Sequence, residues 1–204
     1  MRKGSFIVFE GIEGCGKTTQ AILLAERLKR ESHNVVLTRE PGGTDFGEKI
    51  RNLLLHSDEV SSITELFLFL ADRKEHIEKL IKPSLQNGKI VISDRYFYST
   101  LAYQIGGRGM DKGFVEDLNR AVVNDVVPDL VFYLDITVEE AFIRKSNSKL
   151  DRIEKESLEF HQNIRNHYLK ILREYTNIVK IDGRLAMEEI HRSVYNMLNE
   201  KKLI

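Results

Sequence analysis

The chain has 204 residues, of which 42% are hydrophobic and 30% are charged, which is an ordinary composition for a soluble globular protein. Lysine plus arginine and aspartate plus glutamate number 31 each, so the net charge offers no general attraction to nucleic acid, and no nucleic-acid partner is expected. One cysteine excludes an internal disulfide and is typical of a reducing compartment, and no apolar run is long enough to cross a membrane. With no room for a signal peptide in residues 1–5, we expect one cytoplasmic domain spanning residues 1–204.

The first predicted element is a buried strand at residues 6–9, followed directly by a glycine-rich loop. Residues 11–18 match the pattern G-x-x-x-x-G-K-[ST], the phosphate-binding P-loop, and an apolar helical stripe follows over residues 21–28. Glycines let several backbone N–H groups point at one phosphate cluster at the start of that helix. Lys17 brings positive charge to the outer phosphates, and the Thr18 hydroxyl can ligate Mg²⁺. The residues expected to contact ATP here are Gly11, Ile12, Glu13, Gly14, Cys15, Gly16, Lys17, Thr18 and Thr19.

A second strand is expected at residues 35–38, followed by a Pro-Gly-Gly loop in which Thr44 can cap the next helix. That helix carries one apolar face, formed by Phe46, Ile50, Leu53 and Leu54. A longer helix is expected from about 63 to 81, ending before Pro83. Its six consecutive apolar residues, 66–71, point all round the helix, so core, ligand and a partner subunit can share their burial.

Buried strands alternate with helices to the end of the chain. We expect strands at 89–93, 131–134 and 178–181, helices at 98–104, 114–122, 141–144, 153–175 and 187–200, and a glycine-rich loop at 106–109. This alternation predicts an α/β fold with a parallel sheet sandwiched by helices. Because loops after parallel strands meet at one edge, loops 11–18, 39–41, 94–96 and 182–184 should converge there.

Charged residues at the ends of two strands indicate a metal site and a second phosphate site. Asp94 can hold Mg²⁺ opposite the P-loop, although a helix cap or a surface salt bridge is the alternative. Arg95 and Arg39 can grip a second phosphate, which favours transfer between nucleotides over simple hydrolysis. Phe69 and Arg73 share a helix face and can stack on and hydrogen-bond a base, or they can be a core ring and a surface charge.

From end to end, the sequence resembles the bacterial thymidylate kinases. The motifs that carry the resemblance are residues 9–14 leading into 16–20, 38–44, 68–73, 94–96 with Ser99, 102–104, 133–135 and 150–154, of which the second and the last are highly specific. The resemblance implies the P-loop kinase fold with five parallel strands, a homodimer, and phosphorylation of dTMP to dTDP with ATP and Mg²⁺. It also implies that Glu40-Pro41 is a candidate cis peptide.

The resemblance assigns a role to each matched position around dTMP. Phe69 would stack on thymine and Arg73 would reach its carbonyl edge, while Tyr103 would pack where a ribose carries its 2′-OH. Arg95 would hold the acceptor phosphate and Glu13 would approach the 3′-OH. The implied substrate-binding residues are Glu13, Arg39, Pro41, Phe69, Arg73, Arg95, Ser99, Thr100, Tyr103 and Gln104.

A polar lid at about 144–151 is implied over ATP, with Arg184 bordering the adenine. One family variant carries an arginine in the P-loop where this chain has Gly14, so the lid must supply that charge. Arg144 is the first choice, before Lys145, Lys149 or Arg152. The implied catalytic residues are Glu13, Lys17, Asp94, Arg95 and Arg144, and the implied metal ligands are Thr18 and Asp94.

Two further hypotheses concern Cys15 and the alternative functions. A thiol beside Lys17 at a helix N-terminus is expected to favour the thiolate and to react with alkylating agents unless MgATP shields it.

The nearest alternative function is another nucleoside or nucleotide kinase of the same fold. A GTP-binding switch should show an N-K-x-D motif, which residues 147–151 lack, and a P-loop ATPase should hydrolyse ATP without an acceptor.

Overall fold

Five strands of the chain pair in parallel to form one sheet in the order β2-β3-β1-β4-β5, which confirms the predicted five-stranded parallel sheet. The computed structural model describes residues 4–57, 59–146 and 150–204. The strands are β1 (Phe6–Glu10), β2 (Val35–Arg39), β3 (Ile90–Asp94), β4 (Leu130–Asp135) and β5 (Ile178–Asp182).

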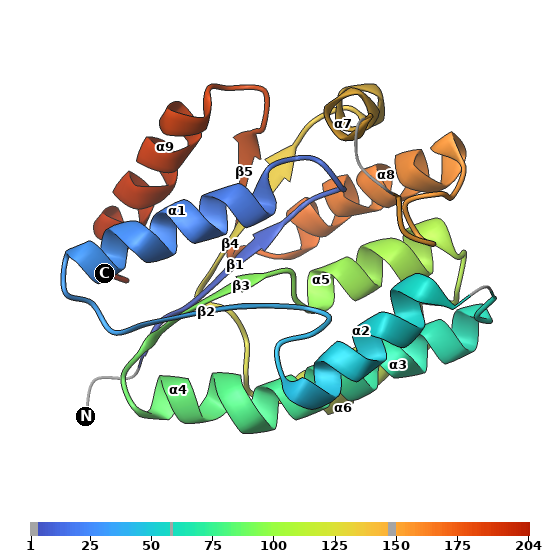
Figure 1. Ribbon diagram of the computed structural model, residues 1–204, viewed down its shortest axis with the longest axis horizontal. Coiled ribbons are helices and arrows are strands. Elements are labelled where there is room, and N and C mark those ends of the chain that lie inside the picture. The colour runs from blue at the N-terminus through green and yellow to red at the C-terminus, as the bar shows by residue number, and fades with distance from the viewer. Residues whose placement is uncertain (1–3, 58, 147–149) are drawn as a thin grey trace.

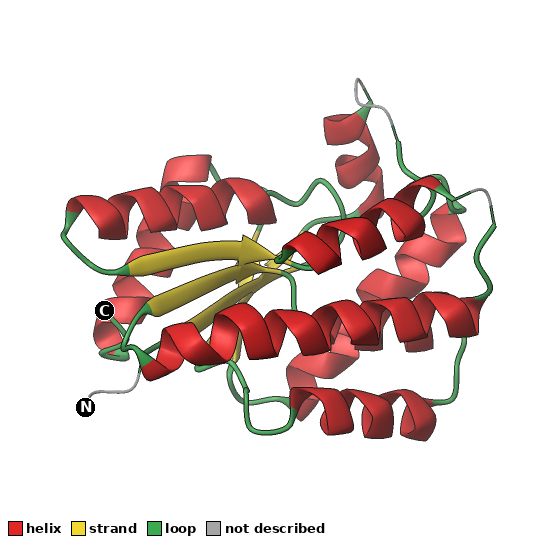
Figure 2. Cartoon of the chain, turned by 60° about the horizontal axis from the view of Figure 1, so that its bottom comes forward, coloured by secondary structure: helices red, strands yellow, loops and turns green. Residues whose placement is uncertain are grey.

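Helices cover both faces of the sheet (Figure 1), as a turned view also shows (Figure 2). Helix α1 packs on α9 and on the three strands β1, β2 and β3, whereas α4 packs on β3 and α8 on β5 from the opposite face. The α-helices are α1 (Lys17–Arg30), α2 (Asp45–His56), α3 (Ser62–His76), α4 (Lys82–Gln86), α5 (Phe97–Thr100), α6 (Lys112–Val123), α7 (Val138–Lys145), α8 (Leu158–Glu174) and α9 (Met187–Glu200). Two π-helical segments, η1 (Ile77–Ile81) and η2 (Leu101–Gly107), continue α3 and α5.

The central strands are buried on both sides because helices cover both faces, which explains their unbroken apolar runs. Phe9 of β1 lies opposite Asp94 of β3 and Phe132 of β4, so the carboxyl ends of these strands lie level. In β2, Arg39 also aligns with Asp94. The loops that follow β1, β2 and β3 therefore open onto one edge, as expected.

Several helix boundaries differ from the sequence-based expectation. The helix predicted to stop before Pro83 runs on, because the π-helical turn η1 directly precedes the proline and α4 begins around it. The helix predicted from 153 begins at Leu158, because the Ser157 side chain caps it by accepting from the Phe160 N–H. Thr44 caps α2 as predicted, accepting a hydrogen bond from the Gly47 N–H.

The predicted glycine loop at 106–109 is partly wrong, because Gly106 and Gly107 lie within η2. A Cβ at Gly107 would come within 2.6 Å of the Phe160 ring, and one at Gly106 within 2.7 Å of the His167 Cβ. These two glycines therefore allow η2 and α8 to pack closely.

The apolar face predicted for α2 is only half buried. Ile50 and Leu54 belong to the core, whereas Phe46 and Leu53 are 50% and 52% exposed. Phe67 of α3 is also 51% exposed, which agrees with the expectation that residues 66–71 face in several directions. Large apolar side chains therefore remain uncovered on two helices that pack against each other.

Candidate active site

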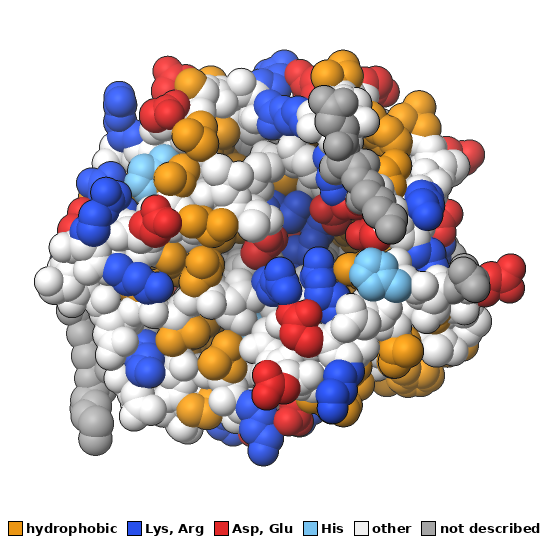
Figure 3. All heavy atoms as spheres, in the orientation of Figure 1, with side chains coloured by type: hydrophobic (Ala, Val, Ile, Leu, Met, Phe, Trp, Pro, Cys, Tyr) orange, Lys and Arg blue, Asp and Glu red, His pale blue; other side chains and the backbone are white. Residues whose placement is uncertain are grey.

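A cleft of about 420 Å³ opens at the carboxyl edge of the sheet. Its walls come from the P-loop, the loop after β2, helices α2 and α3, the end of β3, the α5–η2 helix and the end of α7, together with Asp151, Ile153 and Glu154. Figure 3 shows a hollow on this face in which Lys, Arg, Asp and Glu side chains gather. Most of the residues predicted for ATP and dTMP line this one cleft.

The P-loop glycines adopt conformations that other residues avoid. Gly11, Gly14 and Gly16 have φ values of 143°, 74° and 100°. A Cβ at Gly14 would lie 2.9 Å from the Ala141 oxygen and 3.2 Å from the Lys145 Cγ, so α7 packs directly on this residue. At Gly16 a Cβ would meet nothing within 4 Å, so the backbone faces open space at the start of α1. A loop with backbone N–H groups at a helix start and an open side suits a phosphate group.

Lys17 is buried at the base of the loop. Its Nζ donates to the Ile12 carbonyl at 2.8 Å and lies 3.7 Å from the Cys15 Sγ. Gly14, Gly16, Lys17, Thr18 and Thr19 line the cleft, whereas Gly11, Ile12 and Cys15 form the side of the loop that packs on the protein interior.

The structure contradicts the prediction that Cys15 favours the thiolate. Its side chain is only 1% exposed, and burial raises the pKa of the thiol, which the positive charge of Lys17 only partly offsets. The structure places the thiol beneath the loop, where it packs with the hydrophobic core.

Thr18 and Asp94 come together as the metal prediction requires. The Thr18 hydroxyl donates to Asp94 Oδ2, and both residues line the cleft. The other carboxylate oxygen, Asp94 Oδ1, is buried and has no hydrogen-bond partner among the described residues. A carboxylate with an unsatisfied oxygen beside a hydroxyl is a donor set that suits Mg²⁺, which prefers oxygen ligands and keeps several waters.

Arg95 lies on the floor of the cleft in a left-handed conformation, with φ of 75°. Its Nη1 donates to the Gly11 carbonyl at 3.0 Å and to the Ser99 hydroxyl at 2.9 Å. Its Nη2 donates to Glu13 and to the Tyr103 hydroxyl. A guanidinium held on several sides is fixed in place before any ligand arrives.

Glu13 joins the P-loop to this arginine. Burial alone would raise the pKa of its carboxyl group, but Arg95, Lys17 and Lys145 together hold that pKa well below its usual range. Glu13 is therefore ionised at neutral pH, and its carboxylate also accepts from the Tyr103 hydroxyl at 3.2 Å.

Arg73 is a buried charge and not a surface one, which settles one alternative left open by the sequence. Its side chain is 2% exposed, and its Nε donates to Glu40 Oε2 at 2.8 Å. Its Nη1 donates to Thr100 and to Asn119. The other carboxylate oxygen, Glu40 Oε1, lies 2.9 Å from Nδ1 of the fully buried His76. Arg73 and Phe69 both line the cleft from α3, which places a ring and a guanidinium side by side.

The loop after β2 closes one wall of the cleft. The Glu40–Pro41 peptide is cis, as predicted. Arg39 lines the cleft and pairs with Glu48 at 2.7 Å, both side chains being substantially exposed. Arg51, which the sequence did not single out, also lines the cleft and donates to the Pro41 carbonyl at 2.9 Å.

The residues predicted for the base pocket divide into two groups. Ser99, Thr100 and Tyr103 line the cleft, although the Ser99 hydroxyl is engaged with Arg95 and Glu10. Gln104 does not line it: the side chain is fully buried and donates to Glu65 at 3.0 Å. The physical reason is that η2 turns Gln104 towards α3, whereas Tyr103 faces the P-loop.

The lid candidates are placed unequally. Arg144 and Lys145 line the cleft from the last turn of α7, where Arg144 Nη2 donates to the Gly183 carbonyl at 3.0 Å and Lys145 pairs with Glu154. Arg152 points away and pairs with Glu65 at 2.6 Å. Arg184 is exposed and pairs with Asp182, outside the cleft lining. Residues 147–149 of the predicted lid, and so Lys149, lie outside the described residues.

Several residues that shape the site had no sequence signal. Glu10 is buried at the end of β1, Tyr168 comes from α8, and His76 and Glu65 come from α3. Each acts through contacts with residues far away in the sequence, such as Glu10 with Tyr168 at 2.8 Å. Glu10 lies within a motif quoted for the resemblance, but only the fold shows what its side chain holds.

Comparisons with known proteins agree with this geometry. A family model described as thymidylate kinase matches residues 9–194. A thymidylate kinase from Fervidobacterium nodosum is 48% identical over 194 residues, covering 95% of this chain and 98% of its own length. Another from Sulfurihydrogenibium sp. is 47% identical over 204 residues, covering 98% of this chain and all of its own. The crystal structure of thymidylate kinase from Ehrlichia chaffeensis matches with a TM-score of 0.81 and 39% identity, covering 97% of this chain and 99% of that one. The P-loop and the arginines lie at one edge of a parallel five-stranded sheet, and the family model and the relatives match nearly the whole sequence. The chain therefore belongs to the thymidylate kinase family.

Proposed function

We propose that the cleft performs the family's reaction, the phosphorylation of dTMP to dTDP, with ATP as the donor and Mg²⁺ as the metal. The observation that carries the proposal is the position of Arg95. It lies in the same cleft as Lys17 and Thr18 and is linked to the P-loop through Glu13. A second fixed cation beside a P-loop provides for an acceptor phosphate as well as a donor phosphate.

On the donor side, the P-loop backbone would bind the ATP phosphates, and Lys17 would neutralise the outer ones. Thr18 and Asp94 would hold Mg²⁺, which supplies further charge neutralisation when bound. Arg144 lines the cleft from α7, so it is our candidate for the cation that stabilises the moving phosphoryl group. Arg184, on the exposed turn after β5, would border the adenine.

On the acceptor side, Phe69 would stack on thymine and Arg73 would hydrogen-bond its carbonyl edge. Arg95 and Arg39 would bind the acceptor phosphate, with Arg51 beside them as an addition from the structure. Glu13, held ionised by its neighbours, would approach the 3′-OH, and Tyr103 would pack against the sugar. We withdraw Gln104 as a direct base contact because its side chain is fully buried against Glu65.

These roles require no general base. Phosphoryl transfer passes through a loose transition state, so alignment and charge neutralisation provide most of the catalysis. A phosphate oxygen of dTMP already carries negative charge near pH 7. The residues therefore have two tasks, which are to aim that oxygen and to neutralise the transferred group.

An assay of ADP release tests the function directly. The protein is supplied with MgATP and, separately, with dTMP, dUMP, dCMP, dGMP, thymidine or no acceptor. We expect rapid ADP release with dTMP and very little with thymidine or without an acceptor. Preference for thymidine would make the protein a nucleoside kinase, and release without an acceptor would make it an ATPase.

We also propose a homodimer, as the resemblance implies, and we assign its interface to α2 and α3. Phe46, Leu53 and Phe67 each expose about half of their surface on these two neighbouring helices. Large exposed apolar side chains on neighbouring helices are typical of an interaction surface. A second copy of the chain would cover them.

Light scattering tests the dimer. The expected mass is twice the chain mass of 23.6 kDa at micromolar concentration. Phe67→Asp should give a monomer, whereas Ile143→Asp, on a side chain that is 73% exposed on α7, should remain dimeric. A monomeric wild-type protein would exclude this assembly.

The chain is further proposed to act in the cytoplasm as one domain spanning residues 1–204, because its single cysteine fits a reducing compartment. Among the described residues, the structure contains no helix with the length and apolar character needed to cross a membrane.

A further inference from the structure

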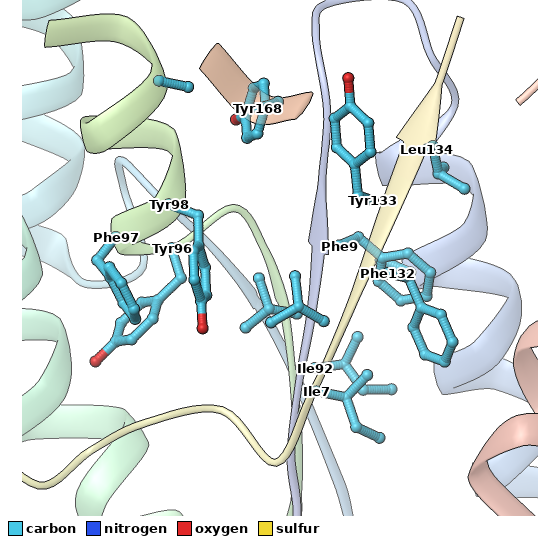
Figure 4. Close-up of a cluster of buried hydrophobic side chains, with 14 of the residues drawn as sticks. Ile7, Phe9, Ile92, Tyr96, Phe97, Tyr98, Phe132, Tyr133, Leu134 and Tyr168 are labelled. Atoms are coloured by element: carbon cyan, nitrogen blue, oxygen red, sulfur yellow. The ribbon is translucent and has the colours of Figure 1, made fainter. Parts of the chain in front are cut away.

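Arg95 is supported from behind by a helix that no substrate-binding motif includes. Tyr168 of α8 lies 73 residues further along the chain, and its hydroxyl accepts from Arg95 Nη1 at 3.3 Å. Tyr168 is only 2% exposed and does not line the cleft, so it acts on a substrate only through another residue. Figure 4 shows its ring beside Tyr133, and the two ring centroids are 5.0 Å apart.

Behind Tyr168 lies the buried carboxylate of Glu10. Its Oε1 accepts the backbone N–H groups of Tyr96 at 2.9 Å and Ser99 at 3.2 Å. Its Oε2 accepts the hydroxyl groups of Ser99 at 2.6 Å and Tyr168 at 2.8 Å. Four donors converge on one carboxylate that is 1% exposed.

The guanidinium fixes the direction of its own hydrogen bonds, because its N–H groups donate and it has no acceptor. A hydroxyl group has one proton and two lone pairs. The Ser99 and Tyr168 hydroxyl groups share their two protons with Glu10 and with each other, at 2.9 Å, so their lone pairs remain for Arg95. Arg95 Nη1 lies 2.9 Å from the Ser99 oxygen and 3.3 Å from the Tyr168 oxygen. Glu10 therefore orients two hydroxyl dipoles so that both accept from the guanidinium.

The backbone of Arg95 needs such support. Its φ of 75° is uncommon for a residue other than glycine, and such conformations persist only where the surroundings determine them. The Arg95 N–H donates to the Phe9 carbonyl at 2.9 Å, and the Ser93 hydroxyl donates to the Arg95 carbonyl at 2.8 Å. These contacts fix the backbone, while Ser99 and Tyr168 fix the far end of the side chain.

We propose that Glu10 and Tyr168 are positioning residues that hold the Arg95 guanidinium at the angle required for the acceptor phosphate. The inference rests on the proposed role of Arg95 in phosphate binding. Glu10 aligns the Ser99 and Tyr168 hydroxyl groups, and these align Nη1. Nη2, on the other side of the guanidinium, donates to Glu13 and Tyr103, which both line the cleft.

Tyr168→Phe tests the proposal by removing one oxygen atom and keeping the ring. We expect KM for dTMP to rise about tenfold, the fold-change that corresponds to one hydrogen bond to a charged group. KM for ATP should stay unchanged. The matched control is Tyr98→Phe, which also removes a buried tyrosine hydroxyl, here bonded to Asn177 at 3.1 Å instead of to Arg95. The control should lose a similar amount of thermal stability and leave both KM values unchanged.

Binding measurements separate positioning from general damage to the pocket. Tyr168→Phe should weaken the binding of dTMP and leave the binding of thymidine unchanged, because thymidine lacks the phosphate. Glu10→Gln is the second variant, since an amide at this position donates as well as accepts and removes the common orientation of the two hydroxyl groups. It should also weaken dTMP binding more than thymidine binding.

Three outcomes have distinct meanings. If Tyr168→Phe and Tyr98→Phe show the same KM for dTMP, the positioning role is excluded. Equal losses of dTMP and thymidine binding would also exclude it and would indicate a structural role alone. If the wild-type protein releases no ADP with dTMP, the proposed function fails, whatever the variants do.

Discussion

Two groups of arginines lie at the same edge of the sheet but are held in different ways. Arg73 and Arg95 have side chains that are 2% and 12% exposed, and each donates to at least three partners. Arg39 and Arg184 are 52% and 62% exposed, and they pair with Glu48 and Asp182. The buried group is fixed by folding, so its desolvation is already offset by protein partners. The exposed group keeps its hydration and side-chain freedom until a ligand binds.

The largest expected effect is on the donor side, where Arg144 is supported by one hydrogen bond to the Gly183 carbonyl. Arg144→Ala should lower kcat by about 10³-fold or more, the size seen for arginines that stabilise a transferred phosphoryl group. Binding of dTMP should change little. Single-turnover kinetics measures the chemical step, and Arg184→Ala is the control that should mainly raise KM for ATP. A near-normal kcat would transfer the role to Lys145.

The next effect concerns stability and compares the two groups directly. Arg73→Ala removes one partner of a buried ion pair and should lower the free energy of unfolding by about 3 kcal/mol, because the buried Glu40 carboxylate loses its guanidinium partner. Arg39→Ala breaks an exposed pair and should cost less than about 1 kcal/mol. Denaturant unfolding measures both, and equal losses would remove the distinction between the two groups.

Phe69→Ala tests the base-binding wall beside Arg73. It should weaken dTMP binding by about 1–3 kcal/mol, the range for stacking of a base on an aromatic ring. ATP binding should be nearly unchanged. Calorimetric titration with each nucleotide checks this, and a parallel fall in ATP affinity would contradict the assignment.

A smaller effect should appear in the pH dependence of stability. Burial, and then the negative charge of Glu40, raises the pKa of Asp72 from 3.8 to about 6. A raised pKa means that the folded state binds the proton more tightly than the unfolded state, so this stabilisation is present below pH 4 and is lost as pH rises through 6. Relative to Asp72→Asn, the wild-type free energy of unfolding should fall by on the order of 1–2 kcal/mol across this window.

The asparagine in that variant can still accept from the Gly42 N–H, which lies 3.1 Å from Asp72 Oδ1. Other titrating groups are common to both proteins and cancel in the difference. Denaturant unfolding at several pH values between 4 and 7 measures the window. A constant difference between the two proteins would show that the carboxyl group of Asp72 is not perturbed.

Much of the fold followed from the sequence because local signals agreed with it. The buried strands have unbroken apolar runs, and Thr44 has the chemistry of a helix cap. The errors arose where tertiary packing overrides local preference. Pro83 predicts a helix end, but a π-helical turn precedes it and the helix continues. Gly106 and Gly107 predict a loop, but they lie in η2 and provide room for α8.

The candidate site was predictable at the residues that carry charge at strand ends, such as Arg95 and Asp94. The supports of Arg95 were not, because only the fold shows that the Tyr168 and Glu10 side chains are buried next to it. The expected thiolate at Cys15 was wrong for a related reason. Its place beside Lys17 was read correctly, but its burial follows from the three-dimensional packing of the loop.

The contact between Gly14 and α7 also restricts how this enzyme can evolve. The family variant with an arginine in the P-loop would place that residue at position 14. Here φ is 74°, and a Cβ would come within 2.9 Å of the Ala141 oxygen. A single substitution would therefore strain the loop and collide with the helix that carries Arg144. Moving the charge that we propose for Arg144 to position 14 would therefore require a displaced α7 as well as a new side chain.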